Sequence, residues 1–432
     1  MTKEYFAPAR HQMALPGDVA HVDGGIIFPA GIAYDALIRR KIEKKYPHLQ
    51  RRLIDPQFYL ATLLGAKCKK ACVNLASYGW FATDGFESYD TEKHGKQNQW
   101  KANAKSNIED QWTGTLPEDE KSIEDAVRVC VNVQANVGCE SIILPGPLIT
   151  DLFTDFTVEG TWLDAGLRVA ADLGLGRLAT VAISDSCLRP VAPEKNHLLG
   201  TIIDQVSARE PEGVYLVIET SQDAYYNTDA NTIGSMLRLV HGFKEAGVGT
   251  VVVSLAGVAG LLAIAAGADM TCTGWYRSER RLKLADFDDA QGRSVPTYYS
   301  HALASELDLK EDLDRLTKAG LLDELSDVTP ASKPLLDALR AGKSVSEVAD
   351  WEYRIGNVAA ARQHFMTAMV RETGKLSKLS DAEQREDALK WLVDAEALAK
   401  KISSVGAVTG RSEIQHQRQW RIAFEKFAAS TK

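Results

Sequence analysis

Short apolar runs alternate with longer amphipathic runs along the first 295 residues of this chain. The stretch 250–281 shows the alternation in its most compact form. An apolar, β-branched run at 250–254 is followed by a short apolar run at 257–267 and then by a second strand-like run at 268–273. Strands that are apolar on both faces belong to parallel sheets covered by helices. The stretch therefore predicts a strand, a helix and a second strand parallel to the first.

The same alternation predicts eight strands, most of them separated by helices. The expected strands are 25–29, 51–54, 71–76, 141–144, 178–183, 214–218, 250–254 and 268–273. Eight strands joined by short helical crossovers are typical of a (β/α)8 TIM barrel. A doubly wound open sheet is the competing fold, but it would place a glycine-rich phosphate turn after the first strand, where the sequence has none. We therefore expect an α/β fold of the TIM-barrel type.

Three further segments flank or interrupt the expected barrel, which we place at 21–295. Residues 1–20 carry no periodicity and are expected to form an N-terminal tail. A polar insertion at 81–122 follows the third expected strand, and loops of that length are commonly lids over a site or disordered segments. Residues 296–432 are expected to form a helical C-terminal domain without strands. Its predicted helices are 313–322, 333–341, 357–372, 381–401 and 412–429.

The composition is that of a globular protein with a substantial core, since 45% of the 432 residues are hydrophobic. The six cysteines are scattered, several of them within apolar runs, which indicates reduced thiols in a cytoplasmic protein. No apolar run reaches the roughly 20 residues that span a bilayer, and no basic-then-apolar leader opens the chain. We therefore expect a protein that does not associate with membranes.

The formal net charge of −8 argues against a protein whose whole surface binds nucleic acid. Local basic clusters at 39–52 and 277–283 run against this average, and the last predicted helix carries Arg418, Arg421 and Lys426. Such clusters suit a phosphate backbone, although a solvated helix face is their more common role. For the last helix, docking on the barrel is the favoured alternative. Nucleic acid therefore remains among the expected partners.

Three carboxylates stand where predicted strands end, which is where barrels hold their reactive groups. They are Asp55, Asp185 and Glu219. Converging on one mouth, they would suit a general acid and base, a nucleophile, or ligands of a hard cation such as magnesium. The alternative is that each caps the helix after its strand, as Asp and Ser often do. Glutamate is a poor N-cap, which favours a functional role for Glu219.

No dedicated metal site is predicted. The histidines are isolated from one another, and Cys68 and Cys72 have no second cysteine pair that would complete a zinc site. We therefore identify no cofactor, and magnesium is the one ion that the three carboxylates would suit.

A candidate anion site follows the strand expected at 250–254. Ser254 ends that strand, and Gly257 and Gly260 leave backbone amides open at the start of the next helix. Arg277, after the following strand, would bind a phosphate through its two-pronged guanidinium. The alternative is that the small residues simply let a short helix pack closely on the sheet.

The segments 53–58 and 256–277 carry a family resemblance. The first reads Leu-Ile-Asp-Pro-Gln-Phe, which is similar to an Asp-Ser-Gly-Gly-Phe element, and the second contains a glycine-bearing turn and a Gly-Ala-Asp-Met run. Both resemble the barrel of the tRNA-guanine transglycosylase superfamily. The resemblance implies a glycosyltransferase or hydrolase, with Asp55 at the family's base-recognising aspartate. Thr271 and Cys272 stand where the nucleophilic aspartate would be, and the family's zinc-binding cysteines are absent.

These patterns lead to one main hypothesis and two alternatives. The chain is expected to bind or act on a nucleobase, nucleotide or nucleic acid, with Asp55 contacting the base and Arg277 holding phosphate. Asp185 or Glu219 would serve as acid or base, and the aromatic Tyr78 and Trp80, after the third expected strand, would contact the substrate. The alternatives are a barrel enzyme for a small phosphorylated metabolite and a non-catalytic subunit that docks into a larger complex through its C-terminal helices.

Overall fold

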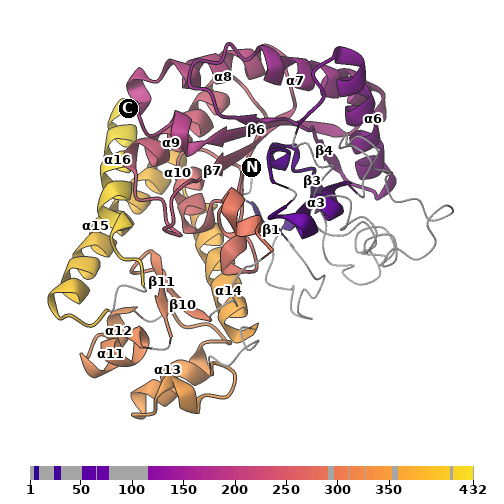
Figure 1. Ribbon diagram of the computed structural model, residues 1–432. Coiled ribbons are helices and arrows are strands. Elements are labelled where there is room, and N and C mark those ends of the chain that lie inside the picture. The colour runs from indigo at the N-terminus through magenta and orange to yellow at the C-terminus, as the bar shows by residue number, and fades with distance from the viewer. Residues whose placement is uncertain are drawn as a thin grey trace, which may run out of the picture.

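The structure is a computed structural model that describes residues 4–8, 24–30, 51–64, 66–76, 115–289, 296–309, 311–325, 327–352, 359–408 and 412–431. A parallel sheet lies at its centre (Figure 1). Within the described residues its strands are β1 (Glu4–Pro8), β2 (Gly24–Pro29), β3 (Arg51–Asp55), β4 (Ser141–Ile143), β5 (Leu148–Ile149), β6 (Gly176–Ser184), β7 (Gly213–Glu219), β8 (Thr250–Ser254) and β9 (Met270–Cys272).

The sheet curls into a half-barrel. The strand order is β3-β2-β1-β9-β8-β7-β6-β4, and β5 pairs with β6 beside β4. Every pairing in it is parallel. The two end strands of this order, β3 and β4, contact each other, although no ladder of hydrogen bonds joins them in the described part of the chain. The fold is therefore mixed α/β with a curled parallel sheet.

The central strands β7 and β8 explain why the sheet is parallel. Val214 and Tyr215 of β7 and Val251 and Val252 of β8 are consecutive pairs that point to opposite faces, and all four are buried, as the two-sided apolar pattern predicts. Full burial of such a side chain contributes roughly 1.5–3 kcal/mol. Because both faces of these strands bury their side chains, helices have to cover the sheet on the outside.

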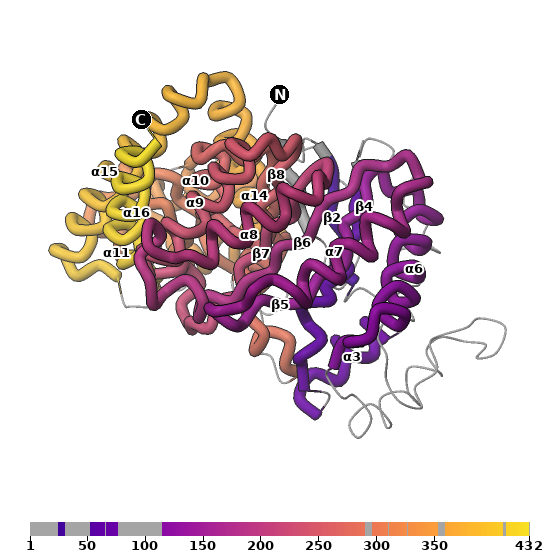
Figure 2. Tube along the Cα trace, turned by 90° about the horizontal axis from the view of Figure 1, so that it is seen from above, coloured from indigo at the N-terminus to yellow at the C-terminus, as the bar shows by residue number. Residues whose placement is uncertain are grey.

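The helices that follow the strands form this cover. They are α6 (Glu120–Asn136), α7 (Thr157–Ala170), α8 (His197–Ser207), α9 (Ala230–Glu245) and α10 (Gly260–Ala265), and α3 (Lys69–Ala76) lies near β3. Three of them begin at a capping side chain: Asp119, Asn196 and Asp229 each accept a hydrogen bond from a backbone amide of the first turn. Seen from above, α6 and α7 border one end of the sheet, and α15 and α16 lie toward the other (Figure 2).

The C-terminal part opens with an antiparallel pair, β10 (Thr297–Ser300) and β11 (Ser305–Asp308). The helices α11 (Asp312–Lys318), α12 (Leu322–Leu325), α13 (Lys333–Arg340), α14 (Ala359–Leu376), α15 (Asp381–Ser404) and α16 (His416–Ser430) follow. Leucines of α11 to α13 build a second hydrophobic core together with Trp351. Phe365 of α14 and Trp420 and Phe424 of α16 return to the core of the sheet, where α16 packs on α9.

Three sequence-based predictions about elements are wrong. Residues 71–76 lie in helix α3 and are not a strand. All six are buried, and a short run that is buried on every side gives a strand and a helix the same pattern. Residues 4–8, assigned to the N-terminal tail, form β1 between β2 and β9. Strands do not stop at 296, because β10 and β11 follow.

Other predictions agree with the structure or fall outside what it describes. The remaining expected strands all occur, and the expected helices 333–341 and 381–401 match α13 and α15 closely. Of the predicted insertion 81–122, residues 81–114 lie outside the described residues, and 120–122 already belong to α6. All six cysteines are buried and free of disulfides. In the described part of the chain, no helix combines the length and the hydropathy needed to cross a membrane.

Candidate functional site

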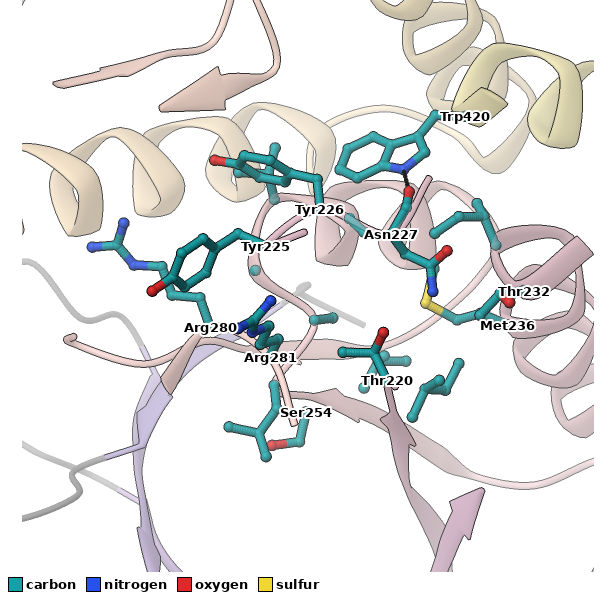
Figure 3. Close-up of a pocket in the computed structure, with 18 of the residues that line it drawn as sticks. Thr220, Tyr225, Tyr226, Asn227, Thr232, Met236, Ser254, Arg280, Arg281 and Trp420 are labelled. Carbon is teal, nitrogen blue, oxygen red and sulfur yellow. Dashed lines mark hydrogen bonds between the residues drawn. The ribbon is translucent and has the colours of Figure 1, made fainter. Parts of the chain in front are cut away.

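A pocket opens at the carboxyl ends of β7 and β8, between the sheet and the C-terminal helices (Figure 3). Its empty volume is about 740 Å³, a figure that includes space open to solvent. Tyr225, Tyr226 and Trp420 lie along one side of it, and Thr220 and Ser254 lie on the opposite side. We call this space the β8 pocket. Its position is the one at which parallel α/β folds bind their ligands.

The walls of the β8 pocket combine aromatic and polar groups. Trp420 of α16 donates a hydrogen bond from Nε1 to the carbonyl oxygen of Asn227 at 2.8 Å, so the C-terminal helix fixes the loop that carries the aromatic pair. The ring of Tyr226 stacks on His416 with centroids 4.4 Å apart. The Oδ1 atom of Asn227 accepts from the amide of Asp229 at 2.8 Å. Within the described residues, the amide nitrogen Nδ2 of Asn227 donates no hydrogen bond to the protein.

Behind the pocket, Asp55 anchors a buried polar network. Ser254 lines the pocket, and its Oγ lies 2.8 Å from the hydroxyl oxygen of Tyr215. Asp55 Oδ2 accepts from the hydroxyl of Tyr215 at 2.9 Å and from that of Tyr59 at 2.5 Å, while Oδ1 accepts from the amide of Gln57 at 3.0 Å. Asp55 is not among the pocket-lining residues, so Ser254 and Tyr215 connect it to the pocket.

Burial dominates the acid–base properties of this network. Desolvation raises the pKa of Asp55 to about 6, because it outweighs the hydrogen bonds from Tyr59, Tyr215 and Gln57 that favour the charged form. Burial also raises the pKa of both tyrosines well above their ordinary value, and the nearby Asp55 raises them further. Asp55 is thus a carboxyl that can hold or release a proton near neutral pH.

The predicted pair Asp185 and Glu219 lies at the ends of β6 and β7. Asp185 accepts from the hydroxyl of Ser221 at 2.9 Å and from its amide at 3.1 Å, so it braces the loop after β7. Ser184, and not Asp185, caps the short turn that follows β6. Glu219 accepts from the hydroxyl of Ser184 at 2.7 Å. Burial, and then the neighbouring Asp185, raises the pKa of Glu219.

These two carboxylates do not complete a metal site. Among the described residues, no group of three or more His, Cys, Asp and Glu side chains is arranged to hold an ion. Asp55 binds tyrosines, and Asp185 and Glu219 bind hydroxyls and amides of adjacent loops. The described residues therefore provide no set of ligands for the magnesium ion that was expected at the three carboxylates.

The predicted glycines are explained by close packing. Gly257 has a positive φ of 53°, and a side chain there would lie 2.9 Å from the carbonyl oxygen of Arg280. A Cβ on Gly260 would lie 1.9 Å from Oγ1 of Thr271, so glycine lets α10 approach β9. Gly257 also lines the β8 pocket, whereas Gly260 does not.

Arg277 is not among the pocket-lining residues, and it meets a carboxylate of its own chain. Its guanidinium stacks over the ring of Tyr225 at 4.0 Å, and its Nε lies 3.7 Å from Oε2 of Glu306. Arg280 forms a second ion pair with Glu306 from within the pocket wall, and Tyr226 donates to the same carboxylate at 3.2 Å. The negative charge beside Arg277 therefore comes from Glu306 of the same chain, whereas the sequence-based hypothesis expected it to come from a bound phosphate.

The structure joins the predicted residues in three separate groups. Asp55 and Ser254 share the network behind the pocket, Asp185 and Glu219 lie together, and Arg277 lies with Glu306. Tyr78 and Trp80 fall outside the described residues. Sequence reasoning missed Tyr215, Glu306 and the placement of Trp420 in the pocket wall. Tyr215 could have been recognised in the sequence, because it is the one residue with a polar group in the apolar run 214–218 of β7.

The positions that carry the family resemblance are also defined. Thr271 and Cys272 are fully buried in β9, and Oγ1 of Thr271 lies 3.4 Å from the carbonyl oxygen of Val253. Burial raises the pKa of the Cys272 thiol far above its ordinary range, which keeps the sulfur protonated and poorly nucleophilic. Neither residue is therefore placed to replace the nucleophilic aspartate of the family.

Comparison with protein-family models gave no match, and comparison with curated proteins gave none either. Among solved structures, the chain is similar to the carboxyl transferase domain of pyruvate carboxylase from Rhizobium etli with pyruvate, at 11% identity and a TM-score of 0.26 over 71% of this chain and 62% of that one. A variant of that domain with pyruvate gives 11% identity and a TM-score of 0.28 over 92% and 80%. The chain spans less than two thirds of the first of these domains, and a likeness this weak carries no conclusion about function.

Proposed function

We propose that the chain binds a nucleobase, free or as part of a nucleotide or nucleic acid, in the β8 pocket. The observation that carries the proposal is the lining of this pocket at the carboxyl ends of β7 and β8. Its lining includes the half-buried ring of Tyr225 beside the buried rings of Tyr226 and Trp420. Planar bases stack on aromatic rings, a contact that contributes roughly 1–3 kcal/mol per base. Asn227 and Ser254 offer polar groups for the edge of the base.

The chemistry that this site supports is proton transfer and not covalent exchange. Asp55 lies behind Ser254 and Tyr215 with a pKa of about 6, near the pH at which an acid–base group works best. The buried Thr271 and Cys272 leave the transglycosylase-like covalent route without a nucleophile at that position. We therefore propose a transglycosylase-like recognition of the base with altered chemistry.

A small phosphorylated metabolite is the weaker candidate. The three arginines nearest the pocket are Arg277, Arg280 and Arg281, and each one pairs with a carboxylate of the chain, Glu306 or Asp286. A phosphate would have to compete with those carboxylates, although Nε and Nη2 of Arg277 make no hydrogen bond within the described residues. Docking of the C-terminal helices into a larger complex is also less favoured, because α16 already buries Phe424 and Phe427 in the core of the sheet.

We also propose that the half-barrel is completed as a (β/α)8 barrel, with β3 beside β4. The contact between these two end strands of the sheet order supports this closure. An experimental structure that shows hydrogen bonds between β3 and β4 would sustain the proposal, and a persistent gap between them would refute it.

Calorimetric titration with nucleosides tests the proposed ligand. We expect thymidine and other nucleosides to bind the purified chain, and ribose 5-phosphate to bind far more weakly. Ala256→Phe, which fills the pocket from its wall, should abolish nucleoside binding. Ala397→Phe on the exposed face of α15 is the matched control and should leave binding unchanged. If no nucleoside binds, or if Ala256→Phe binds as the native chain does, the proposal is wrong.

A further inference from the structure

The hydrogen-bond chain behind the β8 pocket has a direction that one proton sets. It runs from Ser254 Oγ to the hydroxyl of Tyr215 and on to Asp55 Oδ2, with oxygen separations of 2.8 and 2.9 Å. A phenol carries one proton, so Tyr215 can donate to only one of its two neighbours at a time. Its choice depends on whether Asp55 is charged, because an ionised carboxylate only accepts hydrogen bonds.

The two protonation states give Ser254 opposite roles. When Asp55 is ionised, Tyr215 donates to it and Ser254 donates to Tyr215. Ser254 Oγ can then only accept, from the neighbouring Cys272 thiol or from a ligand in the pocket. When Asp55 takes up a proton from solvent, it donates to Tyr215, and Tyr215 then donates to Ser254. The hydroxyl proton of Ser254 is released from Tyr215 and can be donated elsewhere, to the neighbouring Cys272 sulfur or to a ligand in the pocket. One O–H bond is formed on Asp55, the two hydrogen bonds of the chain reverse their direction, and no other covalent bond is made or broken.

Tyr59 does not compete for the added proton. Gln57 forms a side-chain hydrogen bond with Tyr59 that favours the charged phenolate, so Gln57 donates to the tyrosine oxygen. That oxygen is thus already in use as an acceptor, and Tyr59 stays a donor to Asp55. Tyr215 is therefore the group that accepts the proton of neutral Asp55.

Among the described residues, the other titratable groups that face Asp55 do not titrate in the same range. They come from four elements: Tyr59 of the turn after β3, Tyr215 of β7, Cys272 of β9 and Cys130 of α6. Burial raises the pKa of each of these hydroxyl and thiol groups, so all four stay neutral near pH 7. Asp55 is therefore the group whose charge sets the direction of the chain.

We infer that Asp55, Tyr215 and Ser254 form a relay that sets whether the floor of the β8 pocket offers a ligand a hydrogen-bond acceptor or a donor. The inference rests on the proposed function, because it concerns how the same pocket chooses among bases. Acid conditions select a base edge that accepts at this point, and alkaline conditions select one that donates. Ser254 and Tyr215 are thereby specificity-determining residues.

Thymidine and 5-methyl-2′-deoxycytidine test the relay. They share sugar and methyl group, but where one base presents a carbonyl acceptor the other presents an amino donor. The ratio of their two dissociation constants, measured by calorimetry from about pH 5 to about pH 8, spans the titration of Asp55. We expect the ratio to change by about tenfold in the native chain, the size of one hydrogen bond made or lost.

Three variants separate the relay from the titration of the ligand itself. Tyr215→Phe and Asp55→Asn each cut the relay, and Ser254→Ala removes its last member, so in all three the ratio should follow only the ligand's own titration. Tyr298→Phe is the matched control, because the hydroxyl of Tyr298 donates to the carbonyl oxygen of Asp327 in the second core. It should keep the native dependence on pH.

The outcomes distinguish the relay from the proposed ligand. If both nucleosides bind and the native ratio has the same dependence on pH as in Tyr215→Phe, the relay is refuted and the nucleobase proposal stands. If neither nucleoside binds at any pH, the proposed function is refuted and the relay falls with it. A tenfold change that Asp55→Asn and Ser254→Ala both abolish sustains the relay even where Tyr215→Phe fails to fold.

Discussion

Asp55 and Glu306 are two buried carboxylates beside the same pocket, and their acid–base behaviour is opposite. Each side chain belongs to a residue that is only 2% exposed. Asp55 is held by two phenols and one amide, whereas Glu306 is held by Arg277, Arg280 and the hydroxyls of Thr297 and Tyr226. Burial raises the pKa of Asp55 to about 6. For Glu306 burial acts the same way, but the two arginines outweigh it and the pKa is lowered.

The difference teaches that the charge of the partners, and not burial, separates a titrating carboxylate from a permanently ionised one. Glu306 belongs to β11 and binds arginines that follow β9, so it joins the antiparallel pair to the sheet. Within the part of the chain that the structure describes, Asp55 has only neutral partners, so its ionised form is poorly stabilised and its proton is available. The first site is suited to holding the fold together, and the second to exchanging a proton.

The largest effect is expected from Glu306→Gln, which breaks the charged side of the comparison. The variant leaves the buried guanidinium of Arg280 without its counter-charge. Removal of one partner from a buried ion pair costs about 3–5 kcal/mol. Urea unfolding followed by tryptophan fluorescence should show this loss as a lower midpoint.

Glu212→Gln is the control for Glu306→Gln. Glu212 pairs with Arg177 at 2.5 Å, but its side chain is 47% exposed. Exposed pairs contribute at most about 1 kcal/mol. If both variants lose the same small amount, Glu306 and its arginines do not form a tightly coupled buried cluster, and the contrast with Asp55 is lost.

A second, smaller effect is expected from Asp55→Asn, through the dependence of stability on pH. The folded pKa of Asp55, about 6, lies above the ordinary value of 3.8. The proton therefore binds the folded chain more tightly, so the stability from Asp55 is fully present below about pH 4 and is lost as the pH rises through 6. The loss amounts to about 3 kcal/mol. Asp55→Asn should remove this slope from the free energy of unfolding measured between these pH values.

Asp312→Asn is the control for Asp55→Asn. Asp312 is also fully buried and accepts from the hydroxyl of Ser412 at 2.6 Å, but it lies with the second core. This variant should keep the native slope between pH 4 and 6. A native slope that persists in Asp55→Asn would show that another group carries it, and Asp55 would then be no different from Glu306.

The sequence allowed the sheet to be predicted better than the site. Two-sided apolar runs such as 214–218 and 250–254 mark parallel strands whatever surrounds them, because both faces are buried. The run 71–76 failed for the same reason, since a short segment buried on all sides has no period that separates a helix from a strand. β1 could not be predicted from its own five residues, because its place depends on the ladders that β2 and β9 provide.

The candidate site depends on distant pairings that no local pattern reveals. Asp55 was predicted from its place at a strand end, but its partner Tyr215 is 160 positions away in the chain. Arg277 was assigned to a phosphate from its place after a predicted strand, but its partner Glu306 lies on a strand that the sequence did not predict. In both cases the residue type was informative, and its role was decided by a contact across the fold.

Glu219 sharpens the comparison as an intermediate case. Its pKa is raised by burial and by Asp185, while Arg189 and Lys283 act against the rise. Lys283→Met removes one of the opposing charges, so the pKa of Glu219 should rise further and the pH window in which its stability is lost should move upward. The change in unfolding free energy should stay below about 1 kcal/mol. Lys333→Met, which removes an exposed lysine of α13, is the control. If both variants have the same pH profile, Lys283 does not act on Glu219, and the surroundings of Glu219 are then uncharged like those of Asp55.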